Sequence, residues 1–375
     1  MTLFMETRRH IEELQTLRGF AALLVALSHL TTIYAVPDKV RISIDALLNA
    51  HAAVIIFFIL SGYVLTGSLV RRGLGSGQVA GFYVGRIFRL YPAVWFVSLL
   101  SIVFLASAPP RLILPAASSW FMQYLYPVLS LKTILLSFAT LNFSLIPPIW
   151  SVFVEFLGSF LMPVLVGVSL WRPRLLPWLV LVMGLAVYPL AHAPHMLNYL
   201  CYMFDFGLGV LIAVYGSRVI FNAPLTTIAA SSMVLLFFRP LWFGLLNGHL
   251  MPIVVGYNDA TPMIVEALAG SVLIAVLAAG HGRSTLLNHA FSVRLGDISF
   301  SFYLIHLPLG ILLAKLLSNI FNIATSPILA MCSLVVACVA LSLILAEFLF
   351  RFIEIPANNL GKRVSASLAK HLGNM

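Results

Sequence analysis

The chain has 375 residues, of which 61% are hydrophobic and only 9% are charged, and its mean hydropathy is +1.03. These values lie far outside the range of soluble domains and indicate a polytopic membrane protein. The formal net charge of +10 is scattered over short hydrophilic connections, which argues against nucleic acid as a partner. We therefore expect an all-α, multi-pass protein whose surroundings are the lipid bilayer.

Cysteine and histidine spacing gives no sign of a disulfide framework or a metal site. The three cysteines, Cys201, Cys332 and Cys338, all lie inside apolar runs. The ten histidines are not spaced as zinc ligands, and the sequence has no GxSxG elbow, Walker loop or HExxH motif. We expect no metal cofactor.

Ten apolar segments of about 20 residues each predict ten membrane-spanning helices. Connections rich in Pro, Gly or charge, such as "RRGLGSGQ" and "APPRLILP", separate them. The predicted spans cover residues 16–36, 46–70, 84–106, 148–169, 175–192, 198–216, 225–244, 260–280, 298–320 and 326–350.

Basic residues predict that both termini face the cytoplasm. Most Lys and Arg residues then fall at cytoplasmic helix ends, and the opposite ends hold only Lys39, Arg41, Arg111, Lys132 and Arg239. The charged "METRRHIEEL" leads into the first span without a small-residue cleavage site, so we expect that helix to be retained.

The chain is predicted to form one membrane domain over residues 1–375, without internal repeats and without a fused soluble domain. Residues 107–147 form the longest segment between spans and are apolar enough to lie along the outer interface. We expect this segment to lie over an outward-facing site as a lid.

Arg18 and His29 share one face of the first span, because residues eleven apart on a helix differ by three turns plus about 20°. The rise between them is about 16 Å, which places Arg18 at the cytoplasmic end and His29 near the middle of the bilayer. An imidazole in apolar surroundings is expected to be neutral and can accept a proton, as a general base does. The alternative is a histidine hydrogen-bonded between helices, with Arg18 as a membrane anchor.

Arg86 and Arg89 lie three residues apart in "FYVGRIFRLYPAVW" and are therefore neighbours on one helix face. In the first turns of a helix, two guanidinium groups oppose the helix dipole and repel each other, unless an anion such as phosphate bridges them. Arg18 falls at the same cytoplasmic level, so a ligand with several phosphates would reach all three. The alternative is a pair of anchors that contact lipid phosphates.

Acidic residues in the outer halves of three spans predict a polar cavity that opens outward. "PPIWSVFVEF" carries Trp150, Ser151 and Glu155. A carboxylate at this depth needs a partner, which is an imidazole that it orients, a substrate hydroxyl or a structural ion pair. Asp205 and Glu266 fall at similar depths, each with a structural role as the alternative.

"LGDISFSFYLIHLP" opens the ninth span with Ser299, Tyr303 and His306 on one face, at spacings of four and three. His306 is a candidate second proton carrier, and the alternative is a hydrogen bond that packs helices or lines the cavity. At the end of the last span, Arg351 and Glu354 in "FRFIEIP" predict a local ion pair.

In combination, these blocks resemble the membrane acyltransferase-3 family, whose ten-helix members O-acylate bacterial surface polysaccharides and exported oligosaccharides. The resemblance follows the family's order over almost the whole chain. Its blocks are "LQTLRGFAALLVALSHL", "FFILSGYVLTGSLVRR", "FYVGRIFRLYPAVW", "IPPIWSVFVEF", "LGDISFSFYLIHLPL" and "FRFIEIPANNL". The family often has an acidic residue before the first Leu-Arg pair, where this chain has Gln15 and Thr16, so no role of that residue carries over.

The resemblance implies His29 as the catalytic base, Arg18 as its motif partner, Arg86 and Arg89 as contacts for acyl-coenzyme A, and Glu155 as a required position. We therefore expect an O-acetyltransferase of the bacterial plasma (inner) membrane. Its donor would be acetyl-coenzyme A, and its acceptor an extracytoplasmic glycan or lipid-linked saccharide. Weaker candidates for substrate binding are Trp150, Ser151, Asp205, Glu266, Tyr303 and His306.

The main alternative function is proton-coupled secondary transport. In that interpretation His29, Glu155, Asp205 and Glu266 form a proton relay across the membrane. The sequence has no inverted repeat that favours a transporter.

Overall fold

The computed structural model describes residues 12–106, 117–122, 129–216, 219, 222–247, 259–280, 287–318, 323 and 325–373. Within these ranges the chain is helical apart from turns and one isolated β-bridge between Tyr34 and Ala117. The helices are α1 (Glu12–Thr31), α2 (Asp38–Leu47), α3 (Ala50–Arg72), α4 (Ser76–Ala106), α5 (Ser119–Met122), α6 (Leu131–Phe138), η2 (Pro147–Ile149), α7 (Trp150–Trp171), η3 (Pro173–Leu175), α8 (Leu176–Ala191), η4 (His195–Tyr202), α9 (Met203–Tyr215), α10 (Pro224–Asn247), α11 (Ala260–Ala278), α12 (Ala290–Asp297), α13 (Ser299–Leu317), α14 (Pro327–Leu349), the π-helical η6 (Phe350–Glu354) and α15 (Ile355–Gly373).

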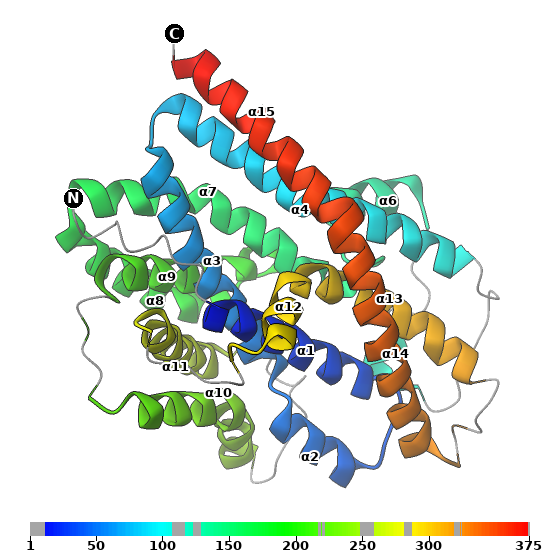
Figure 1. Ribbon diagram of the computed structural model, residues 1–375. Helices are drawn as coiled ribbons and strands as arrows, with labels where there is room; N and C mark the ends of the chain where they lie inside the picture. Colours follow the sequence, from blue (N-terminus) through cyan, green and yellow to red (C-terminus); the bar gives the residue numbers. More distant parts are fainter. Residues whose placement is uncertain are drawn as a thin grey trace.

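The predicted all-α polytopic architecture is confirmed. In the part of the chain that the structure describes, nine helical stretches are long and apolar enough to cross a membrane, and each coincides with a predicted span. The remaining predicted span, 16–36, corresponds to α1, which is helical but is not among the nine. Helix α1 carries Glu12, Glu13 and Arg18 and packs against α3, α12, α13 and α14 (Figure 1), so much of its surface meets protein.

Two helices are longer than hydropathy predicts. Helix α4 begins at Ser76, two turns before the predicted start, and α14 continues through η6 into α15. Figure 1 shows α15 lying along α4. Glycines allow this close approach, because a Cβ atom at Gly361 would lie 2.5 Å from Cβ of Phe88, and one at Gly77 would lie 2.9 Å from the Ala369 carbonyl oxygen. Helix α15 carries several charges, so a hydropathy pattern does not detect it.

The centre of the bundle is the pair α3 and α9, which touch backbone to backbone. A Cβ atom at Gly62 would lie 2.3 Å from the Phe206 carbonyl oxygen, and one at Gly209 would lie 2.2 Å from the Ile59 carbonyl oxygen. Small residues let membrane helices approach in this way. Helix α3 also packs against α1, α7 and α11, and it carries Ser61 toward the cavity described below.

We predict that Gly209→Ala destabilises the protein, because the new methyl group collides with the backbone of α3. Overpacking of this kind costs about 1–3 kcal/mol. Gly167→Ala in α7 is the matched control, since its Cβ atom would meet only the Leu74 side chain, at an ordinary 3.6 Å. Melting temperatures of the two variants in detergent check this, and equal values would contradict the close α3–α9 contact.

Candidate active site

A cavity of about 190 Å³ lies between α1, α3, α4, α7 and α13. Its walls are largely apolar, with Phe57, Phe58 and Phe300 among them. The polar lining consists of Arg18, Ser61, Arg86, Arg89, Ser151, Glu155, Ser299 and Tyr303. Helices distant in the sequence thus bring all three predicted donor-binding arginines to one cavity, together with the predicted Ser151, Glu155 and Tyr303.

Glu155 binds two other residues of the cavity lining, Arg86 and Ser61, and does not contact His29. Its carboxylate pairs with Arg86 and accepts hydrogen bonds from the Ser61 hydroxyl at 2.7 and 2.8 Å. Arg86 also donates to Ser159 Oγ at 2.9 Å. These contacts support the structural ion pair among the three predicted roles of Glu155. Glu155 does not orient the His29 imidazole by direct contact. Ser61 was not a predicted site residue, although it lies in the "FFILSGYVL" block.

Arg89 pairs with a carboxylate from the far end of the chain. Glu354 binds Arg89 and accepts a hydrogen bond from Ser301, whereas Arg351 pairs with Glu347. The predicted local pair of Arg351 and Glu354 is therefore wrong. Helix spacing indicated this pair, but Glu354 is buried and its carboxylate binds Arg89 of α4 and Ser301 of α13.

The two reasons for expecting an anion between Arg86 and Arg89 do not hold in the structure. Both residues lie ten or more positions into α4, which begins at Ser76, so they are not in its first turns. Each guanidinium group also has its own carboxylate. Arg18 differs, because its polar contact is with Gln15 Oε1 at 3.4 Å. Over the described ranges, no carboxylate lies within ion-pair distance of Arg18, which leaves a cavity-lining cation suited to a negatively charged ligand.

His29 is not among the residues that line this cavity, and it binds His306. His29 Nδ1 is 2.9 Å from His306 Nε2, and His306 Nδ1 is 2.6 Å from the Tyr303 carbonyl oxygen. Tyr303 lines the cavity, and three helical residues rise about 4.5 Å, so one turn of α13 connects the cavity to His29. His29 is partly exposed, and His306 is fully buried.

Trp120 is a contact of His29 that sequence reasoning missed. Its ring stacks on the imidazole with centroids 5.5 Å apart. Trp120 belongs to α5, within the segment 107–147 that was predicted to lie at the outer interface. Ser118 fastens this part of the segment by donating to the Thr32 carbonyl. Residues 107–116 and 123–128 lie outside the described residues, so the predicted lid as a whole stays a prediction.

Tyr303 lines the cavity, and its hydroxyl is hydrogen-bonded on two sides. It accepts a hydrogen bond from Ser151 at 2.9 Å and donates to the Pro148 carbonyl at 3.1 Å. Trp150, the next predicted residue, packs against Tyr199, Tyr202 and Phe58. It supports the wall behind Phe58 and does not line the cavity.

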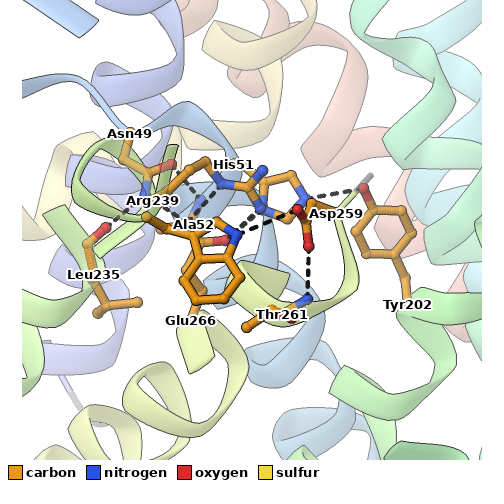
Figure 2. Close-up of polar contacts among 10 residues, drawn as sticks. Asn49, His51, Ala52, Tyr202, Leu235, Arg239, Asp259, Thr261 and Glu266 are labelled. Carbon is orange, nitrogen blue, oxygen red and sulfur yellow. Dashed lines mark hydrogen bonds and ion pairs between the residues drawn. The ribbon is translucent and has the colours of Figure 1, made fainter. Parts of the chain in front are cut away.

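Glu266 belongs to a second polar network, shown in Figure 2. Its carboxylate binds Arg239 at 2.9 Å through both oxygens, Asn49 at 2.7 Å and His51 at 2.6 Å. His51 also contacts the Tyr202 hydroxyl at 3.2 Å. Arg239, His51 and Glu266 are fully buried.

Asp205 is also buried, on α9, and neither Asp205 nor Glu266 lines the cavity that contains Glu155. The predicted outward-facing cavity shared by these three acids is therefore wrong. Their similar depth indicated one site, but Glu155 and Glu266 each pair with a different arginine, and of the three acids only Glu155 lines the cavity.

The family comparison covers nearly the whole chain. A family model described as "Acyltransferase domain" matches residues 11–347. Searches of curated proteins and of solved structures gave no match. The matched range contains every residue of the cavity and the contact between His29 and His306.

We predict that Glu266→Leu destabilises the protein by about 3–5 kcal/mol, because it removes the carboxylate that neutralises the buried Arg239 guanidinium group. The double variant Arg239→Met with Glu266→Leu should regain much of that loss, since it removes both charges. Glu347→Gln is the control, because Glu347 pairs with partly exposed arginines and such pairs contribute less than about 1 kcal/mol. Thermal or denaturant unfolding measures all three, and a harmless Glu266→Leu would contradict the buried ion pair.

Proposed function

Because the chain belongs to the acyltransferase domain family, we propose that it transfers an acetyl group from acetyl-coenzyme A to a hydroxyl group of an extracytoplasmic glycan or lipid-linked saccharide. The observation that carries this proposal is the cavity lined by Arg18, Arg86 and Arg89, one helical turn from a contact between two histidines. We place the protein in the bacterial plasma (inner) membrane, with the arginine-lined end toward the cytoplasm.

Arg18 is the first contact of the donor in this proposal. Arg86 and Arg89 are already paired with carboxylates, so Arg18 supplies the cationic charge that a phosphate can neutralise. Charge-assisted hydrogen bonds between guanidinium groups and phosphate are among the strong ones in proteins. Arg86 and Arg89 keep donor hydrogens beyond their ion pairs and complete the phosphate site.

The size of the cavity indicates which part of the donor enters it. Pockets that enclose a whole drug-sized ligand measure about 300–1,000 Å³, whereas this cavity measures about 190 Å³. The nucleotide therefore stays at the basic entrance and only the pantetheine arm extends inward. The thioester passes Tyr303 to reach His29, which requires the hydrogen bonds of the Tyr303 hydroxyl to open.

His29 acts as the general base. Its imidazole removes the proton from the acceptor hydroxyl as the oxygen attacks the thioester carbonyl carbon. The carbon–sulfur bond then breaks, and the thiolate takes the proton back from the imidazolium to leave as coenzyme A. General-base assistance of this kind contributes about 10²- to 10⁴-fold to rate, and holding both substrates at one site adds proximity. Acyl transfer through an acyl-imidazole on His29 uses the same atoms in two steps.

Trp120 supplies the acceptor side of this site. The Trp120 ring stacks on His29 from α5, away from the arginine-lined cavity. An aromatic face with a polar edge is a suitable surface for a sugar that presents one hydroxyl to the base. The acceptor therefore approaches His29 past Trp120, and the donor approaches from the arginine-lined cavity.

The proton-coupled transporter is less well supported. A relay requires His29, Glu155, Asp205 and Glu266 to communicate, but Glu155 pairs with Arg86 and Glu266 pairs with Arg239 and His51. In the ranges that the structure describes, these are separate networks on different helices.

We predict that His29→Ala inserts and folds but transfers no label from radioactive acetyl-coenzyme A to the native glycan in isolated membranes, because the base is lost. His192→Ala is the matched control, since His192 is exposed at the end of α8. Wild-type transfer by His29→Ala would exclude His29 as the base.

We predict that Arg18→Gln raises KM for acetyl-coenzyme A by about tenfold or more and leaves KM for the acceptor unchanged. A hydrogen bond to a charged group contributes about 1.5–3 kcal/mol, which corresponds to this change. Arg351→Gln is the control, because Arg351 lies outside the cavity lining and its side chain is 63% exposed. A rise in acceptor KM alone would place the donor elsewhere.

A further inference from the structure

We propose that His306 is a positioning residue that selects the tautomer of His29, so that Nε2 of His29 is the atom that accepts the proton. The inference rests on the proposed function for its catalytic meaning, but the tautomer itself is a property of the resting protein. It follows from two hydrogen bonds in series, from the Tyr303 carbonyl through His306 to His29.

The first hydrogen bond determines the tautomer of His306. Its Nδ1 lies 2.6 Å from the Tyr303 carbonyl oxygen, and a carbonyl oxygen only accepts, so Nδ1 carries a hydrogen. The ring is fully buried, and among the described residues no carboxylate contacts it. A charged imidazolium would lack a counterion there, so His306 is neutral and its Nε2 carries a lone pair.

The second hydrogen bond passes this constraint to His29. His306 Nε2 lies 2.9 Å from His29 Nδ1. Because His306 Nε2 is an acceptor, His29 Nδ1 must be the donor, and the remaining nitrogen of a neutral His29 is Nε2 with a free lone pair. The opposite tautomer would set two lone pairs against each other and leave a buried acceptor without a partner. Losing that hydrogen bond disfavours the opposite tautomer by about tenfold or more.

Packing holds the two rings in the orientation that this hydrogen bond needs. Their planes differ by 12° and their centroids are 5.2 Å apart. Trp120 stacks on His29, and the thiol of Cys338 on α14 donates to the His306 carbonyl at 3.2 Å. The buried histidine is thus held by α13 and α14, and it orients the partly exposed one on α1.

The arrangement also explains how His29 returns to its starting state. When Nε2 accepts a proton, Nδ1–H stays bonded to His306, and the neutral acceptor stabilises the imidazolium. The proton then leaves from Nε2 to the departing thiolate, because Nδ1–H remains engaged. One nitrogen therefore exchanges protons with the substrates, and the other keeps the ring oriented.

Kinetics of two variants at His306 test the inference. His306→Leu has similar volume and no acceptor, so kcat for acetyl transfer should fall by about a hundredfold with little change in KM for donor or acceptor. His306→Gln places a side-chain oxygen where Nε2 was and should restore at least a tenth of wild-type kcat. An active wild type, an inactive His29→Ala and a wild-type kcat for His306→Leu would together overturn the inference while leaving the proposed function intact.

The ¹⁵N spectrum of the imidazole rings tests the tautomer without any need for activity. In histidine-labelled protein, comparison with His29→Ala identifies the signals of His29. The wild type should show a protonated Nδ1 and an unprotonated Nε2, and both tautomers should be populated in His306→Leu. A protonated Nε2 on wild-type His29 would overturn the inference, and this measurement decides even where His306→Leu fails to fold. Absence of acetyl transfer by the wild type, with the expected tautomer present, would instead reject the proposed function.

Discussion

Three arginines inside this bundle are held by carboxylates from other helices. Arg86 has Glu155, Arg89 has Glu354 and Arg239 has Glu266. Removing a charge from water costs several kcal/mol, so a buried ion without a partner is strongly disfavoured. Arg18 is the cation in the cavity lining for which the described residues provide no such partner. In the proposed function, a negatively charged ligand supplies the partner that Arg18 lacks.

Much of the fold could be predicted because apolar length is a local property of the chain. Hydropathy locates nine helical stretches of the described chain, and the spacing of Arg18 and His29 places them on α1 at two different levels. It underestimates α4 and does not detect α15, because α15 is stabilised by packing on α4 and not by its own hydrophobicity. Hydropathy also predicts a span at 16–36, whereas α1 is not among the nine stretches and packs against α3, α12, α13 and α14.

The sequence alone identified many residues of the site, but it did not predict which of them contact each other. Six of the predicted residues line one cavity, and His29 and His306 meet beside it. Spacing along one helix, however, reveals only neighbours three or four residues apart. Glu354 reaches Arg89 across 265 positions, and His29 reaches His306 across 277. Such pairings depend on which helix faces meet, and a single sequence with an apolar pattern on nearly every face does not specify them.

The uninterrupted helix from Pro327 to Gly373 connects the cavity to a distant part of the molecule (Figure 1). Glu354 lies in its π-helical turn, an irregularity that widens the helix by one residue and is often found at functional positions. Within this continuous helix, α15 packs on α4 and α14 packs on α13. Because α15 packs closely along α4, any displacement of α15 would move α4 with it, and the two guanidinium groups that α4 contributes to the cavity would move together with the carboxylate that holds Arg89.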